Sequence, residues 1–284
     1  MDAREPHEHL KILCIADGGL IKGAYSVGVG LALEELGYTD VFTDFVGVSS
    51  GAPSAAYYLG GNIFEGGTLI YDECCSKRFL SRWRFWAPVD TNYIVDVLRG
   101  VTGKALRLEK IFNSPTKLHI GVSDFTTAKP KLISPRTQEE LLESIRASIL
   151  LPSVSRGKVY LAGRRCFDGG VSYPHIINEA VTTLDFTHVL IHTSQNYKDE
   201  KISKFETFLC SSVFRHRTSK MGRFAFRNRR RARREALDTL LARTDVASLL
   251  VWGDGSIGGA ERDSSKVREV VQKSHDWWMK IMNE

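Results

Sequence analysis

The chain lacks several features that would point to common classes of protein. None of its apolar runs is long enough to span a bilayer, which argues against a membrane-spanning helix. It contains no C-x-x-C and no H-E-x-x-H spacing, so the usual signatures of a structural zinc site and of a zinc hydrolase are missing. Its five cysteines are an odd number, which argues against a disulfide framework.

The N-terminal segment MDAREPHEHLK carries charges where a signal peptide needs an apolar run. With 43% hydrophobic and 25% charged residues, the composition is typical of a soluble globular protein with a sizeable core. We therefore expect a cytoplasmic protein, or one that visits a membrane surface.

Positive charge is concentrated in one segment. Residues 215–234 contain ten Lys or Arg and no acidic residue, whereas the remainder of the chain holds 29 basic and 33 acidic residues. Three roles fit such a run: binding to anionic phospholipid, binding to nucleic acid, or a solvated helix face paired with Glu206, Glu235 and Asp238. Nucleic acid ranks last, because no recognised nucleic-acid-binding module accompanies the run.

The first sixty residues alternate between strand and helix patterns. Lys11–Ala16 and Val41–Val48 are apolar runs typical of buried strands, and Ala24–Leu36 and Ala52–Leu59 are typical of helices. Such a βαβα order predicts a mainly parallel sheet with helices on its faces.

The pattern continues toward the C-terminus. Further strands are expected at 116–123, 131–134, 158–162, 165–167 and 187–194, and helices at 138–150 and 173–183. We expect residues 1–200 to form the main domain. Residues 201–284 are expected to form a basic, mostly helical extension packed on the core, with one candidate strand at Ala247–Trp252.

A G-x-S-x-G motif follows the second strand, in Gly47–Gly51 (GVSSG). Ser49 is its central serine, whereas Ser50 would be flanked by Val48 and Ala52 and does not fit. Small neighbours let such a serine take a strained backbone conformation between strand and helix, where the helix N-terminus favours developing negative charge. Because the strand and helix context is present, we interpret Ser49 as a nucleophile rather than as part of a plain turn.

A glycine-rich turn, Gly18–Gly23 (GGLIKG), follows the first strand. In a parallel sheet this turn and the Ser49 turn lie at the same edge. Its backbone N–H groups suit an oxyanion hole. A phosphate-binding P-loop fits less well, because Ala24 and Tyr25 stand where that motif needs Lys and Ser or Thr.

Two kinds of residue are candidates for the general base. An α/β-hydrolase-type triad would use a late histidine, and His188, His192, His216 and His275 are available. The other candidate is Asp168, which precedes two glycines in a tight turn and would gain basicity by partial burial.

Three blocks of the chain occur in the order and spacing of one known family. Asp17–Tyr25 (DGGLIKGAY) is similar to its G-G-G-x-[RK]-G oxyanion loop, and Gly47–Ala52 (GVSSGA) to its nucleophile elbow. Ile145–Pro152 (IRASILLP), followed by Phe167–Gly170 (FDGG) and Pro174, is similar to its R-A-S-x-x-x-P and D-G-[GA] motifs. Over about residues 10–195 the chain therefore resembles the patatin-like phospholipases, and is nearest to the bacterial subgroup with a helical C-terminal extension.

The resemblance implies a three-layer α/β/α sandwich and hydrolysis of acyl esters in lipids, of the phospholipase A, lysophospholipase or esterase type. It implies a dyad of Ser49 and Asp168 without a histidine, an acyl-enzyme intermediate, and no metal or other cofactor. The oxyanion loop it implies consists of Gly18, Gly19, Leu20, Ile21, Lys22 and Gly23, and the supporting glycines are Gly47, Gly51, Gly169 and Gly170.

Leu20 departs from the family pattern, because it stands where the third glycine of the oxyanion loop would be. If the loop needs a positive φ there, a leucine costs strain. This departure supports a second hypothesis, in which the chain is a catalytically weak patatin-like module that binds lipid or a partner.

Cations and aromatic residues also alternate in Lys77–Trp86 (KRFLSRWRFW). One interpretation is an interfacial flap that meets lipid headgroups. The other is a surface helix with a buried aromatic stripe. Together with residues 215–234, this segment is the candidate contact with an anionic membrane surface.

Overall fold

The computed structural model describes residues 10–81, 83–84, 87–152, 154–194 and 219–283. One mixed sheet runs through this part of the chain in the order β5-β6-β3-β2-β1-β7-β8, with β4 paired to β3. The strands are β1 (Ile12–Ala16), β2 (Asp44–Val48), β3 (Lys117–Asp124), β4 (Pro130–Ile133), β5 (Val159–Leu161), β6 (Arg164–Asp168), β7 (His188–Thr193) and β8 (Ala247–Trp252).

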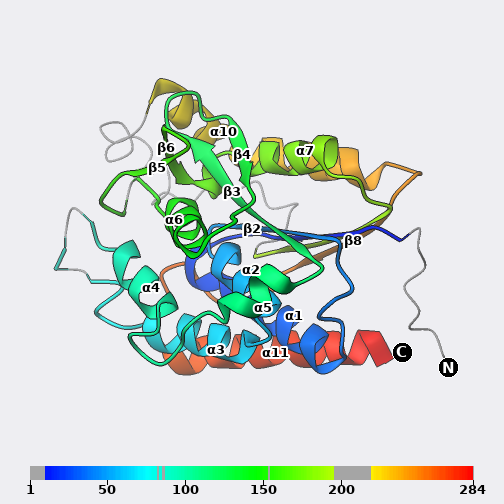
Figure 1. Cartoon of the computed structure of the whole chain (residues 1–284), viewed down its shortest axis with the longest axis horizontal. Helices are drawn as coiled ribbons and strands as arrows, with labels where there is room; N and C mark the ends of the chain where they lie inside the picture. Colours follow the sequence, from blue (N-terminus) through cyan, green and yellow to red (C-terminus); the bar gives the residue numbers. More distant parts are fainter. Residues whose placement is uncertain (1–9, 82, 85–86, 153, 195–218, 284) are drawn as a thin grey trace.

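Helices cover both faces of this sheet (Figure 1), which gives the expected three-layer α/β/α sandwich. One face carries α1 (Ala24–Glu35), α2 (Gly51–Leu59) and α11 (Ser264–Asn283), and the other carries α7 (Tyr173–Thr183) and α10 (Lys220–Leu241). The remaining described helices are η1 (Leu20–Gly23), α3 (Ile63–Thr68), η2 (Leu69–Glu73), α4 (Thr91–Leu98), α5 (Leu108–Asn113), α6 (Gln138–Ser148) and η3 (Gly169–Val171).

The centre of the sheet is parallel, and its register decides where two turns meet. Strand β1 lies between β2 and β7, and Ala16 aligns with Gly47 on one side and His192 on the other. The carboxyl ends of β1 and β2 are therefore level. The turns that begin at Asp17 and Ser49 consequently emerge side by side at one edge, where sites form in parallel sheets.

Strand β6 reaches the same edge from the opposite direction. Val48 of β2 aligns with Gly121 of β3, and the next β3 residue, Val122, aligns with Asp168 in an antiparallel pair. Residues 49 and 168 thus meet although they are far apart in the sequence. The short β5–β6 hairpin that makes this possible joins the strands expected at 158–162 and 165–167.

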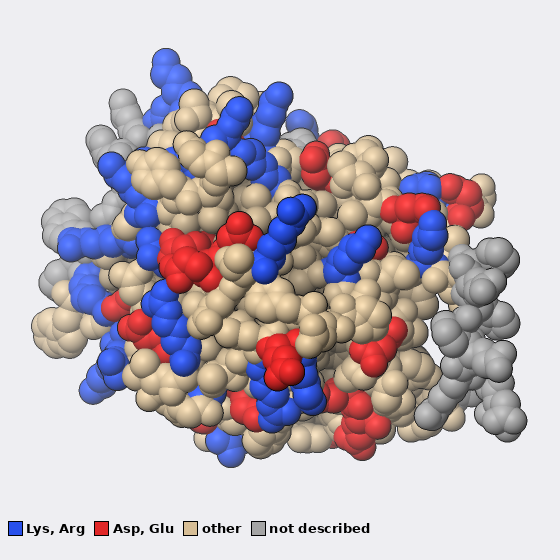
Figure 2. Space-filling model, in the orientation of Figure 1, with Lys and Arg blue, Asp and Glu red and all other residues tan. Residues whose placement is uncertain are grey.

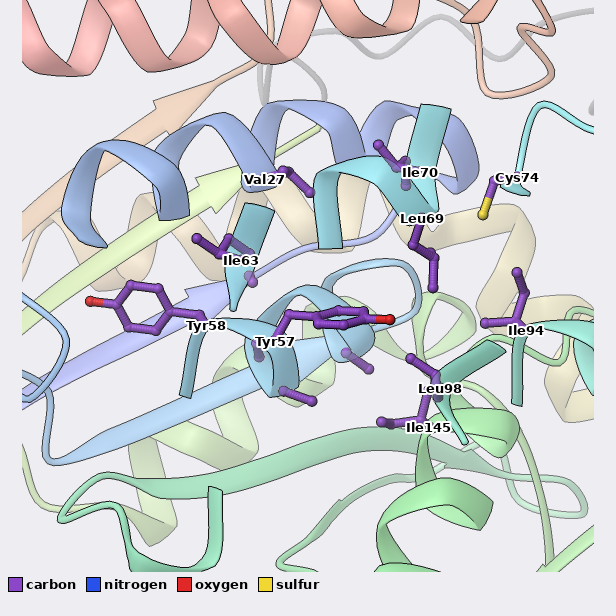
Figure 3. Packing of buried hydrophobic residues seen from close by; sticks show 14 of the residues in the cluster. Val27, Tyr57, Tyr58, Ile63, Leu69, Ile70, Cys74, Ile94, Leu98 and Ile145 are labelled. Carbon is purple, nitrogen blue, oxygen red and sulfur yellow. The ribbon is translucent and has the colours of Figure 1, made fainter. Parts of the chain in front are cut away.

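Helices on the α1 side enclose the larger apolar cluster (Figure 3). Tyr57 of α2 lies at its centre, among Val27, Ile63, Leu69 and Ile145, and is fully buried. The Tyr57 hydroxyl donates a hydrogen bond to the Lys104 backbone oxygen at 2.6 Å, so its polar end is satisfied. Burying a side chain of this size stabilises the fold by about 3 kcal/mol, which makes α2 a rigid support for the turn before it.

Helix α11 adds to this layer by packing along α1. A side chain at Gly28 of α1 would come within 2.5 Å of Ser274 Cβ and of the Val271 oxygen. The glycine therefore lets the two helices approach closely. Within the described ranges, no helix has the length and apolarity needed to cross a membrane.

Most expected elements are present with small changes at their ends, and the strand predicted at Ala247–Trp252 is confirmed. Strand β2 begins at Asp44, because Val41 is already 37% exposed, and α6 ends at Ser148. The surface helix considered for 77–86 is wrong at the described positions, where residues 77–79 and 83 lie in turns and Leu80 forms an isolated β-bridge with Val89. There Phe79 is buried and Trp83 is 86% exposed.

Candidate active site

Ser49 occupies the sharp turn between β2 and α2 and has a φ of +52°. A non-glycine residue in this region is strained, which is the conformation that a nucleophile elbow requires. The turn has no room for larger neighbours. A side chain at Gly51 would come within 2.3 Å of the Ala16 oxygen, and one at Gly47 within 2.7 Å of Ala52 Cα.

Ser148, the last residue of α6, holds this turn in place. The Ser49 backbone N–H donates to Ser148 Oγ at 2.8 Å, and Ser148 Oγ donates to the Gly121 oxygen at 2.7 Å. The serine of the R-A-S block thus has a structural role that the motif alone did not reveal. It fixes the elbow to β3 through a buried side chain.

Asp168, at the end of β6, lies opposite Ser49. The Ser49 hydroxyl donates to Asp168 Oδ2 at 3.1 Å, and the Gly170 N–H donates to Asp168 Oδ1 at 2.7 Å. A side chain at Gly169 would come within 2.2 Å of the Gly121 oxygen, so the turn needs glycine for its close approach to β3. Both Ser49 and Asp168 are buried.

Burial raises the pKa of Asp168 to about 7. The neighbouring Asp17 raises it further, whereas the hydrogen bonds from Gly170 and Ser49 and the charge of Arg229 lower it. A carboxylate with a pKa near neutrality is suited to accept a proton and later return it.

The histidines have other partners. His192 lies on β7, where its Nδ1 is 3.0 Å from Ser26 Oγ and its Nε2 is 3.4 Å from Cys14 Sγ, and burial lowers its pKa to about 4. His188 contacts Thr187, and His275 contacts Glu35. His216 lies outside the described residues. Among the described histidines, none hydrogen-bonds to Ser49 or Asp168.

The Gly18–Gly23 loop lies against the elbow. A side chain at Gly18 would come within 2.2 Å of Ser49 Cβ, and the Gly19 N–H donates to Ser50 Oγ at 3.1 Å. Leu20 has a φ of +56°, so the position that departs from the family pattern does take the left-handed conformation. Such a conformation costs a leucine about 1–2 kcal/mol.

One ion pair beside the loop was not foreseen from the sequence. Arg233 of α10 is buried, and its Nη1 lies 3.4 Å from Asp17 Oδ2. Burial raises the pKa of Asp17 to about 6, against the charge of Arg233, which lowers it. Asp17 Oδ1 also accepts the Gly18 N–H at 2.5 Å, so α10 is tied to the start of the Gly18–Gly23 loop.

Other charges of α10 pair along the helix. Arg231 lies 3.5 Å from Glu235 and Arg234 3.7 Å from Asp238, as the solvated-face interpretation expected, whereas Glu206 lies outside the described residues. In the described parts of the chain, no group of three or more His, Cys, Asp or Glu side chains could hold a metal ion.

Comparison with known proteins assigns the chain to a family. The model of the family described as "Patatin-like phospholipase" matches residues 15–181. The curated proteins include no match. Among solved structures, VipD from Legionella pneumophila is 14% identical with a TM-score of 0.47, and the alignment covers 96% of this chain and 67% of VipD.

Two structures of ExoU are also similar. In the SpcU–ExoU complex from the type III secretion system of Pseudomonas aeruginosa, ExoU is 15% identical, with 96% and 61% of the two chains covered and a TM-score of 0.33. The type III effector ExoU alone is 11% identical, with 95% and 53% covered and a TM-score of 0.35. The chain thus spans between half and two thirds of the length of ExoU. With the family model matching more than half of its residues, this chain belongs to the patatin-like phospholipase family.

Proposed function

We propose that this chain is a lipid acyl hydrolase that works through a Ser49–Asp168 dyad and an acyl-enzyme intermediate. The observation that carries the proposal is the 3.1 Å hydrogen bond from Ser49 Oγ to the buried Asp168 carboxylate. Membership of the family supports a lipid ester as the substrate.

In the first half-reaction Ser49 Oγ attacks the ester carbonyl carbon while its proton passes to Asp168. The carbonyl π electrons move to the oxygen, and the oxyanion takes over N–H groups of the Gly18–Gly23 loop, where Gly18 and Gly19 donate to Asp17 and Ser50 in the free protein. The carbon–oxygen bond to the alcohol then breaks. The departing oxygen takes the proton from Asp168, which leaves an acyl group on Ser49 and an ionised dyad base.

The second half-reaction repeats these steps with water. Asp168 accepts a proton as the water oxygen attacks the acyl carbon, and the bond to Ser49 Oγ breaks. Ser49 regains the proton from Asp168, and the fatty acid is released. A single carboxylate with a pKa of about 7 can serve both halves.

The alternative of a catalytically weak module that binds lipid or a partner rested on Leu20. Leu20 adopts the left-handed backbone, and Gly18 of the same loop lies against Ser49. We therefore favour the hydrolase and treat the leucine as tolerated strain.

The dyad predicts which side chains are needed for turnover of an uncharged ester such as p-nitrophenyl butyrate. Ser49→Ala and Asp168→Asn are each expected to lower kcat by about a thousandfold or more, because one removes the nucleophile and the other its base. His192→Gln should stay within about threefold of the wild type. Steady-state kinetics measures this, with circular dichroism to confirm folding, and an inactive but folded His192→Gln would contradict the dyad.

The charge of Arg229 predicts a shift in the pH profile. Asp168 must be ionised to accept a proton, so kcat/KM should rise with pH through about 7. Since Arg229 lowers the pKa of Asp168, Arg229→Gln should move this limb to higher pH. Arg227→Gln, on the exposed side of the same helix, is the control. An equal shift in the control, or a shift to lower pH, would show that Arg229 does not act on the base.

Two exposed apolar residues and two cations near the start of α10 suit contact with an anionic membrane. Phe224 is 64% exposed and Met221 55%, beside Lys220 and Arg223. Figure 2 shows Lys and Arg gathered on the side where α10, β5 and β6 lie. Part of the basic run, residues 215–218, falls outside the described residues.

Phe224→Ser is therefore expected to weaken binding to vesicles that contain phosphatidylglycerol, because it removes an apolar group that would enter the interface. The matched control is Phe64→Ser, which changes an equally exposed phenylalanine on α3. Vesicle co-sedimentation at low and high salt measures the effect. This membrane face would be ruled out if both variants lost vesicle binding equally. It would also be ruled out if the protein bound neutral vesicles as strongly as anionic ones.

A further inference from the structure

A cavity of about 450 Å³ opens between the α6–β5 segment and strand β6, and neither Ser49 nor Asp168 lines it. Its volume falls within the usual range for a small-molecule site, roughly 300–1,000 Å³. One wall is apolar and contains Phe125, Leu150 and Phe167. No element of the mechanism above uses this space.

The other wall is basic. Arg156, Lys158 and Arg165 line the cavity, and no Asp or Glu does. The Arg165 guanidinium lies 3.5 Å from the centre of the Phe125 ring, which places it at the border between the two walls. This combination suits a molecule that has an anionic group joined to an apolar part.

The cavity cations differ from two nearby arginines in whether they pair with a carboxylate. Arg146 pairs with Glu143 at 3.2 Å, and Arg164 with Asp124 at 3.7 Å. Within the described residues, none of the three cavity cations forms an ion pair with a carboxylate. Three positive charges around one hollow repel one another, and an anion bound there would relieve that repulsion.

The same two segments build the cavity and hold the dyad. The Leu150 oxygen accepts the Asp168 N–H at 3.1 Å, and Phe167 directly precedes Asp168. Ser148, which anchors the Ser49 turn, lies two residues before Leu150. Two residues that line the cavity, Leu150 and Phe167, therefore adjoin the Asp168 backbone. In a glycerophospholipid only a few bonds separate the acyl ester from the phosphate.

We propose that this cavity is a subsite for the phosphate of an anionic lipid headgroup, an inference that rests on the proposed acyl hydrolase activity. Arg156, Lys158 and Arg165 would bind the phosphate oxygens by charge-assisted hydrogen bonds, and the apolar wall would cover the adjoining glycerol. Because no carboxylate lines the cavity, it offers no anionic partner to a choline cation, whereas three cations face the phosphate. The subsite thus favours anionic over zwitterionic phospholipids.

Binding to full-length Ser49→Ala protein tests this without turnover. Submicellar dihexanoylphosphatidic acid, measured by titration calorimetry, should bind at least about tenfold more tightly than dihexanoylphosphatidylcholine. Adding Arg165→Gln, or Arg156→Gln with Lys158→Gln, should remove that advantage. The control is Arg164→Gln, which changes a paired arginine in the same hairpin.

Three results would overturn the assignment. One is an unchanged affinity for phosphatidic acid in the cavity variants, and another is an equal loss in Arg164→Gln. The third is inorganic phosphate that binds as tightly as the lipid and depends on the same residues, which would indicate a site for free phosphate.

Kinetics separates this proposal from the proposed function. In protein with Ser49 intact, the cavity variants should raise KM for phosphatidic acid and leave kcat/KM for p-nitrophenyl butyrate unchanged. A fall in kcat/KM for both phosphatidic acid and p-nitrophenyl butyrate would overturn the subsite. If the wild type hydrolyses neither ester, the proposed function fails, while the binding measurement still decides whether the cavity takes an anionic headgroup.

Discussion

The structure of this site depends on one close approach of backbones at the edge of the sheet. The Ser49 turn lies against the end of β1, and the Asp168 turn lies against β3, with no space for a side chain at Gly51 or Gly169. Only this proximity lets a hydroxyl and a carboxylate from strands far apart in the sequence share a hydrogen bond. Two strand registers bring the turns together. Strands β1 and β2 are aligned in parallel, and strands β3 and β6 are aligned antiparallel.

The electrostatic consequence of this close packing is that two carboxylates are buried. Asp17 and Asp168 both have raised pKa values, and each raised pKa means that the ionised form is disfavoured in the fold. Ionised Asp168 lowers the free energy of unfolding at pH above about 7, and this cost lessens as the pH falls toward the ordinary carboxyl range. The charges of Arg233 and Arg229, both on α10, offset part of this destabilisation. The basic helix therefore acts on the two buried carboxylates and is more than a surface feature.

The sequence predicted those parts of the molecule that rest on local patterns. The βαβα order, the elbow around Ser49 and the turn at Asp168 each follow from apolar runs interrupted by glycines. Contacts between distant segments could not be predicted in this way. Helical spacing from Phe226, Leu237 and Leu240 puts Arg233 on the buried face of α10, but nothing in the basic run indicates that it meets Asp17. The cavity beside β6 likewise appears only when two segments are brought together by the sheet.

The central claim is that Ser49 is the nucleophile and that its base is an aspartate. Labelling with a fluorophosphonate followed by peptide mapping tests it most directly, because the probe marks only an activated hydroxyl. The account predicts one adduct, on Ser49, that persists in His192→Gln and forms far more slowly in Asp168→Asn. An adduct on Ser50, or a reaction that needs His192 and ignores Asp168, would contradict it.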